Sequence, residues 1–410
     1  MLNLDKNSVK ITFLGDITCD RPMIKAADNG DGSFNFDDSF IGIKELVESS
    51  DFTVGNLETV FAGKHLGYNP KPVSYNSPED LLKSLKLLGV DMLTTANNHC
   101  LDFGIEGLES THRLLNEYNI YHTGTNSKET ESETYKIIDF NGIRVAFLAY
   151  TDSINPKSNG VRHSRKILKH LNYIGYYKKK KTKEIIKDTL KTILPMEIIN
   201  EIRANYKRKK GIKLVNQFID DNPLTSEDIE QIKLEIKKIK KIKDECDFLV
   251  LLLHAGGQFN LQPGKHTEQI VDMLLPHVDL IVGHHPHVIQ KIERKDDKVV
   301  AYSLGGLNMS MSADYIHHEV LPNYSAYLNL YLEKSKDGEV SNFIDIGFIK
   351  NEEDNNNYTK LSLVDEDTLC NQFEISEYKK LKDRVLKSAV KNWLEILDSL
   401  IFLYKSIINN

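Results

Sequence analysis

The chain has 410 residues, of which 40% are hydrophobic and 27% are charged, as in ordinary globular proteins. Its formal net charge of −6 gives no electrostatic reason to expect a nucleic-acid partner. The polar amino terminus lacks the apolar core of a signal peptide, and no apolar run reaches the ~20 residues of a membrane helix. We therefore expect a cytoplasmic protein. The four scattered cysteines match neither a disulfide framework nor a zinc ribbon and are expected to be reduced: Cys19, Cys100, Cys246 and Cys370.

Three apolar segments near the amino terminus each end in a polar residue that can bind a metal ion. The segments are residues 9–14, 51–55 and 90–96, and the polar residues that follow them are Asp16, Glu58 and Asn98. Each segment has the length and alternation of a strand. Because the carboxyl ends of strands meet at one edge of an α/β sheet, we expect the three polar side chains to lie close together.

The same pattern recurs in the second half of the chain. Residues 247–253 are strongly apolar and end at His254, and residues 280–282 end at a glycine followed by a cluster of imidazoles. Pro286 pushes the preceding residue towards an extended conformation. In an extended backbone, residues two apart point to the same side, so His285 and His287 are expected to face one point. A histidine-rich surface turn is the plain alternative.

The remaining periodicities predict an α/β fold. Helical spacing marks residues 37–49, 77–88, 103–118, 225–243 and 264–275. Asn141-Gly142 predicts the turn of a hairpin over residues 135–150. Three later strands have no helix between them, which predicts antiparallel pairing: residues 299–304, 324–332 and 342–349. The acidic, asparagine-rich residues 351–367 predict a loop.

Two segments differ in composition from the rest of the chain. Residues 155–245 are expected to form a basic helical insertion in a domain over residues 1–350, since residues 162–213 hold 17 Lys/Arg against 4 Asp/Glu. This insertion is either a solvated helical surface or a docking site for an anionic polymer or a membrane-associated biosynthetic complex. Residues 375–410 predict a long amphipathic helix packed on the core, with partner binding as the alternative.

The polar residues at the strand ends form a mixed oxygen and nitrogen ligand set. Two carboxylates, one amide oxygen and three imidazoles exceed the four ligands of a structural zinc site, and they suit a pair of divalent ions bridged by a carboxylate and a hydroxide. Manganese, iron and zinc fit such ligands equally well. His99 lies next to Asn98 and could protonate a leaving group, with Asp102 holding its ring.

Several blocks of the sequence resemble the CapA family of poly-γ-glutamate capsule biosynthesis proteins, a branch similar to calcineurin-like metallophosphatases. The blocks occur in the family's order and are Gly15-Asp16, Gly55-Asn56-Leu57-Glu58, Ala96-Asn97-Asn98-His99 with Asp102 and Gly104, His254 with Gly256, Gly283-His284-His285-Pro286-His287-Val288, and Tyr302-Ser303-Leu304-Gly305.

This resemblance implies a four-layer α/β/β/α metallophosphatase-like sandwich with its metal centre at the sheet edge. It implies that His99 is the proton donor and that the metal ligands are Asp16, Glu58, Asn98, His254, His285 and His287. The chain departs from the family pattern where Thr18 replaces a methionine, Gln258 a glutamate and Gly306 an asparagine, and the nearest asparagine is Asn308.

These features lead to three hypotheses for function. The first is a metal-dependent hydrolase or transferase that acts on an anionic capsule-like polymer or its precursor, at a phosphoester or a γ-glutamyl amide bond, through metal-bound hydroxide. The second is a metal-dependent epimerase of a peptide-like substrate. The third is a non-catalytic scaffold of a polymer-assembly complex, which would lie at the membrane surface through the basic insertion.

Overall fold

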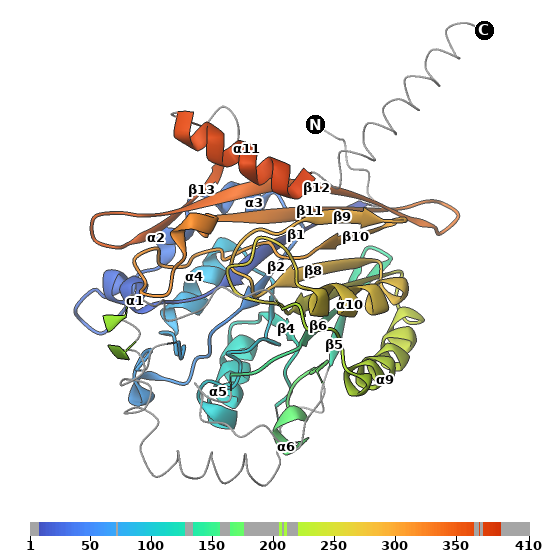
Figure 1. Cartoon of the computed structure of the whole chain (residues 1–410), viewed down its shortest axis with the longest axis horizontal. Coiled ribbons are helices and arrows are strands. Elements are labelled where there is room, and N and C mark those ends of the chain that lie inside the picture. Colours follow the sequence, from blue (N-terminus) through green and yellow to red (C-terminus); the bar gives the residue numbers. More distant parts are fainter. Residues whose placement is uncertain are drawn as a thin grey trace, which may run out of the picture.

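Two β-sheets form the centre of the protein (Figure 1). The computed structural model describes residues 8–70, 73–127, 134–155, 165–175, 205–206, 209–210, 220–364, 369 and 372–386. The first sheet has seven strands, in the order β13 (Thr359–Val364), β12 (Val340–Glu353), β11 (Tyr324–Lys334), β1 (Ser8–Ile17), β2 (Phe52–Leu57), β3 (Met92–Thr94) and β4 (Tyr121–Thr123). The second has six, in the order β5 (Tyr135–Phe140), β6 (Ile143–Thr151), β7 (Phe248–His254), β8 (Leu280–His284), β10 (Lys298–Ala301) and β9 (Ile292–Lys295).

The middle of each sheet is parallel. Strands β1, β2, β3 and β4 run in one direction, and so do β6, β7, β8 and β10. Strand β11 pairs antiparallel with β1, which places the carboxyl-terminal strands at the far side of the first sheet. The parallel arrangement brings the carboxyl ends of successive strands to one edge, where an α/β sheet holds its ligands.

Helices cover the outer face of each sheet. The first sheet is covered by α1 (Arg21–Ala27), α2 (Asp37–Phe40), α3 (Lys44–Glu48), α4 (Asp80–Leu88) and α5 (Gly104–Glu117), and the second by α9 (Ser226–Lys243) and α10 (Lys265–Leu274). The other described helices are α6 (Arg165–Leu168), α11 (Gln372–Leu386) and the short η1 (Lys64–Leu66), η2 (Leu275–His277) and η3 (His318–Val320).

Three apolar clusters separate these layers. The central cluster fills the space between the sheets, where the rings of Phe13 and Phe147 lie 6.5 Å apart. Alternate residues of β7 divide between clusters: Leu252 faces the central cluster and Leu251 faces the helices of the second sheet. A third cluster joins the first sheet to its own helices. These clusters confirm the predicted α/β/β/α layering.

Local signals in the sequence set the boundaries of several elements. The Thr225 side chain accepts a hydrogen bond from the amide of Asp228, whose carboxylate accepts one from the amide of Thr225, and this capping box begins α9. Asn141 and Gly142 have φ values of 53° and 94°, as a two-residue hairpin turn requires. The predicted helices at 77–88, 103–118, 225–243 and 264–275 are confirmed as α4, α5, α9 and α10.

Long-range packing overturned three expectations. The predicted helix at 37–49 is broken into α2 and α3, because Gly42 forms a bridge with Ser362 of β13 and packs against the Leu361 carbonyl. In the predicted loop at 351–367, residues 351–353 end β12 and residues 359–364 form β13, which pairs along β12 and buries Leu361, whereas residues 365–367 lie outside the described residues. Strand β10 does not pair with β11, because it belongs to the other sheet.

The two segments of distinct composition are described only in part. In residues 155–245, α9 packs on the second sheet through Ile232, Ile239 and Ile242. Helix α11 lies beside β12 and β13 (Figure 1), where the Tyr378 ring meets Phe348. Residues 387–410 of the predicted carboxyl-terminal helix and the lysine-rich run at 178–181 lie outside the described residues. None of the described helices is long and apolar enough to cross a membrane.

The buried imidazole of His112, which packs edge-on against the half-buried His122, predicts sensitivity to acid. Burial lowers the pKa of His112 from 6.5 to about 3, and its Nε2 lies 2.7 Å from the Thr125 hydroxyl. The unfolded chain therefore binds one more proton between about pH 6.5 and 3, so stability is lost as the pH falls through this window. The unfolding free energy of the wild type should fall between pH 7 and pH 5, and we expect this fall to be smaller by about 2 kcal/mol in His112→Gln. Urea unfolding at the two pH values measures both falls, and equal falls in the two proteins would contradict the prediction.

Candidate metal centre

Six polar side chains meet where the parallel strands end. Asp16 lies at the end of β1 and His254 at the end of β7, whereas the others follow β2, β3 and β8. The six, all buried, are those predicted as ligands: Asp16, Glu58, Asn98, His254, His285 and His287. The structure thus brings the whole predicted set together.

The backbone around Asp16 is fixed by a segment that touches both sheets, which we call the crossing segment (residues 303–307). The Asp16 amide donates to the Gly305 carbonyl at 2.9 Å, and the Leu307 amide donates to the Asp16 carbonyl at 2.8 Å. The Leu304 amide donates to the Gly283 carbonyl of β8 at 3.2 Å. Gly15 packs so tightly on the Gly305 carbonyl that a Cβ would clash. These hydrogen bonds and the close packing of Gly15 fix the position of the Asp16 backbone between the two sheets.

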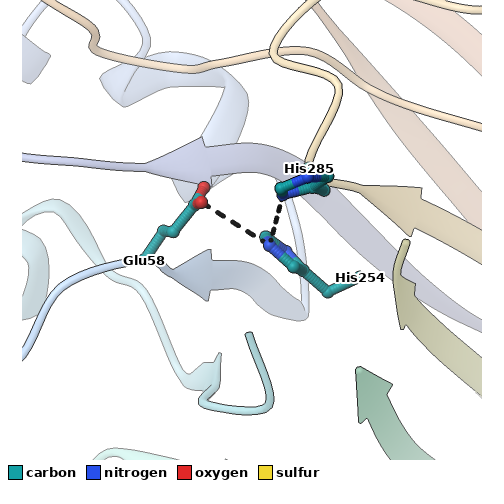
Figure 2. Close-up of side chains that lie close together, drawn as sticks. All are labelled: Glu58, His254 and His285. Atoms are coloured by element: carbon teal, nitrogen blue, oxygen red, sulfur yellow. Dashed lines mark hydrogen bonds and ion pairs between the residues drawn. The ribbon is translucent and has the colours of Figure 1, made fainter. Parts of the chain in front are cut away.

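One group of ligand atoms gathers around His254. Its Nε2 lies 2.9 Å from Asn98 Oδ1, 3.0 Å from His285 Nδ1 and 3.5 Å from Glu58 Oε1. Figure 2 shows Glu58, His254 and His285 pointing towards one another from separate elements. Burial lowers the pKa of His254, and it lowers the pKa of His285 to about 3, so both imidazoles are neutral and keep a lone pair for a metal ion.

A second group gathers beside the first. His287 Nδ1 lies 3.2 Å from Asp16 Oδ2, and its Nε2 lies 3.7 Å from Glu58 Oε1. Burial opposes charge on His287, but the Glu58 and Asp16 carboxylates outweigh it and raise the pKa of His287 to about 9. Burial likewise raises the pKa of Asp16, whereas the hydrogen bond and positive charge of His287 hold that pKa well below its usual range.

Glu58 belongs to both groups, whose ligand atoms each lie within 4.8 Å of one another. Its side chain is fully buried, and neither carboxylate oxygen accepts a hydrogen bond from any described residue. Burial raises its pKa. Since a buried carboxylate without donors is costly, the arrangement fits divalent ions bound on either side of Glu58.

The two histidines after β8 reach the centre by a different backbone path from the one predicted. His285 has φ 97° and His287 has φ 58°, so neither is extended. The left-handed region is costly for residues with a Cβ and is common at functional sites. The prediction that both imidazoles face the centre is correct, but its explanation through an extended backbone was wrong. The His285 amide also donates to Asp16 Oδ2 at 3.0 Å.

His99 and Asp102 form a buried pair at the rim of the ligand set. His99 Nδ1 lies 2.6 Å from Asp102 Oδ2, and Nε2 lies 4.0 Å from Glu58 Oε1. Burial lowers the pKa of His99, but the charge and hydrogen bond of Asp102 outweigh it and raise that pKa above its ordinary value. The Tyr75 amide donates to the same Asp102 oxygen at 2.7 Å, and the Tyr75 ring packs edge-on against His99.

Sequence reasoning missed residues that orient the ligands. The Asn56 side-chain nitrogen Nδ2 donates to Asp16 Oδ1 at 2.8 Å and lies 3.2 Å from His254 Nδ1, so it fixes both side chains. Asn155 Nδ2 lies 3.3 Å from His99 Nε2. Asn56 belongs to the Gly55-Asn56-Leu57-Glu58 block of the family resemblance, and this block was the only feature of the sequence that could have indicated its role. Nothing in the local sequence pointed to Asn155.

The three departures from the family pattern all lie at or near the centre. Gln258 Nε2 is 3.5 Å from His287 Nε2. Asn308 contacts the residue that follows the first strand, because its side chain accepts from the Thr18 amide at 3.0 Å and donates to the Thr18 carbonyl at 2.9 Å. Gly306 forms a bridge with Asp16.

Two facing sheets with a buried carboxylate–histidine cluster at the strand ends define a layered α/β protein with a candidate metal centre. The model of one family, described as bacterial capsule synthesis protein PGA_cap, matches residues 10–309. The chain belongs to this family.

Known proteins resemble the chain at low identity. It is 23% identical over 299 residues to the PGA biosynthesis protein CapA of Bacillus subtilis, covering 72% of this chain and 61% of that protein. It is 24% identical over 311 residues to the capsule biosynthesis protein CapA of Bacillus anthracis, covering 73% of this chain and 60% of that protein. The chain thus matches less than two thirds of the length of these relatives. A solved hypothetical protein from Thermus thermophilus is 10% identical with a TM-score of 0.40, covering 82% of this chain and 99% of that one.

If these residues bind metal ions, the amount of metal bound per chain should depend on His285. We expect His285→Ala to lower the transition-metal content of protein purified without chelator by about two ions per chain, because it removes an imidazole that contacts His254 and the two ions would share Glu58. His284→Gln is the matched control, since His284 points its Nε2 at the Leu14 carbonyl instead. Elemental analysis measures the ratio of metal to protein. Equal content in His285→Ala and the control would contradict the centre.

Proposed function

We propose that the protein is a metal-dependent hydrolase or transferase that holds two divalent ions. The observation that carries the proposal is Glu58, a fully buried carboxylate with no hydrogen-bond donor among the described residues, placed between two sets of ligand atoms. Asp16 and His287 complete one set, and Asn98, His254 and His285 complete the other. Manganese, iron and zinc all suit these ligands. Such ions supply a water of lowered pKa and stabilise negative charge on oxygen.

His99 is proposed to move a proton at its Nε2 atom. Asp102 accepts from Nδ1, which fixes the tautomer and favours the protonated imidazole. The Nε2 proton then faces the centre beside Glu58, where it can pass to a leaving group. Tyr75 holds both partners of this pair, through its amide and its ring. The side chains therefore supply a positioned acid next to the ligand set.

The substrate class is proposed from the family and from the named relatives. The Bacillus subtilis relative is described as a PGA biosynthesis protein and the Bacillus anthracis relative as a capsule biosynthesis protein. We propose that this chain acts on an anionic polymer of that kind, or on its precursor. The bond cleaved is either a phosphoester or a γ-glutamyl amide, since both reactions gather negative charge on oxygen. We further propose that the basic insertion places the protein at a membrane-associated biosynthetic complex.

Paired chromogenic substrates test the reaction. p-Nitrophenyl phosphate and γ-glutamyl-p-nitroanilide report phosphoester and amide cleavage by comparable absorbance changes. We expect metal-loaded wild-type protein to turn over one of them, and we expect His99→Gln to lower kcat by about 10²- to 10⁴-fold, as loss of a general acid does. Elemental analysis of His99→Gln should show wild-type metal content, because His99 is proposed as an acid and not as a ligand.

A matched control and two other outcomes complete this test. His122→Gln changes a half-buried histidine away from the centre and should keep wild-type activity. Deuterium entering a substrate at Cα from heavy water, without cleavage, would favour epimerisation instead. If neither substrate turns over and His99→Gln still supports polymer assembly in cells, the hydrolase proposal fails in favour of a scaffold.

A further inference from the structure

A second group of metal-ligating residues lies outside the candidate metal centre. Asp152, Asp220 and His266 each offer one ligand atom, and these three atoms lie within 4.8 Å of one another. The residues come from three places: Asp152 follows β6, Asp220 precedes α9 and His266 lies in the first turn of α10. Each is half-buried. No hydrogen bond or ion pair joins their side chains among the described residues. The three ligand atoms therefore lie near a common point without bonding to one another.

Asp152 is rigidly placed and carries a free oxygen. Its amide donates to the His254 carbonyl at 3.3 Å. The Oδ1 atom is inaccessible to solvent and has no hydrogen-bond partner in the described part of the chain. A buried carboxylate oxygen without a donor is costly unless a cation lies beside it.

Asp220 and His266 are held together by their backbones. The His266 amide donates to the Asp220 carbonyl at 3.1 Å. Gly264 packs against the same residue so closely that a Cβ would clash with the Asp220 carbonyl oxygen. Asp220 therefore cannot move away from the start of α10 without losing this contact, and the spacing of its side chain from His266 is set by the fold.

A buried hydroxyl without a partner lies next to the same group. Thr267 follows His266 and is 3% exposed, and its Oγ1 has no hydrogen-bond partner within the residues that the structure describes. This oxygen lies within 3.3 Å of the position that a Cβ on Gly256 would take. One unpaired buried oxygen therefore belongs to Asp152 of the group, and another belongs to the residue that follows His266.

We propose that Asp152, Asp220 and His266 bind a further divalent transition-metal ion, separate from the pair proposed around Glu58. Two carboxylates and one imidazole suit manganese or zinc, and the partial exposure of the three residues leaves positions for water. Asp152 and Asp220 are far apart in sequence. The ion would therefore cross-link the residue after β6 to the segment that precedes α9. Such a cross-link reduces the entropy that the chain between them loses on folding.

Metal counting on single variants tests this site. We expect Asp220→Asn and His266→Gln, dialysed against Mn²⁺ and in a second series against Zn²⁺, to hold about one fewer ion per chain than the wild type by elemental analysis. Asp221→Asn is the matched control, because the neighbouring Asp221 is exposed and belongs to no ligand group among the described residues. Circular dichroism in chelator shows whether each variant is folded. Equal metal content in the wild type, Asp220→Asn and Asp221→Asn would overturn the proposal.

The same substitution in a second background separates this site from the candidate metal centre. In His285→Ala protein, Asp220→Asn should remove the ion that remains, and it should abolish the rise in melting temperature on adding Mn²⁺. If His285→Ala lowers the metal content but Asp220→Asn changes neither the content nor the melting temperature, the further site is absent and the candidate metal centre stands. If only Asp220→Asn lowers the content, the further site stands and the candidate metal centre falls.

Discussion

The buried carboxylate of Glu58 is the constraint on which the rest of the centre depends. It follows a strand of the first sheet, yet the imidazoles around it come from the second, because His254 ends one of its strands and His287 follows another. A carboxylate in this position is unfavourable unless positive charge surrounds it. The layered fold brings the imidazoles to the carboxylate. The Glu58 and Asp16 carboxylates raise the pKa of His287, so a positive charge on this imidazole is favoured beside Glu58.

Charge at the centre is divided in a way that suits metal binding. His254 and His285 are neutral, whereas His287 lies between two carboxylates and attracts a proton. A divalent ion would displace that proton, so ion binding and proton release are linked. The acid pair of His99 and Asp102 lies to one side, with its own carboxylate to hold the charge. In the proposed function, ligand and acid roles would thus be carried by different imidazoles.

Much of this arrangement could be predicted from the sequence, for a simple reason. The six ligands follow five apolar segments, and parallel strands bring such ends to one edge whatever the details of packing. Contacts that depend on distant neighbours could not be predicted: the break at Gly42 needs the carbonyl of Leu361, and the role of Asn56 needs both Asp16 and His254. The backbone of His285 was mispredicted because Pro286 restricts a local preference, and tertiary packing overrode that preference.

The crossing segment has a consequence for how the protein can move. Leu304 bonds to β8 in one sheet and, through its carbonyl, to the Ala326 amide of β11 in the other at 2.7 Å, while Gly305 and Leu307 bond to Asp16. Directional hydrogen bonds resist sliding of one sheet over the other. The opposite rim is tied as well, because the Lys334 ammonium of β11 donates to the Gly142 carbonyl in the turn between β5 and β6 at 2.7 Å. We therefore expect the two sheets to move as one body.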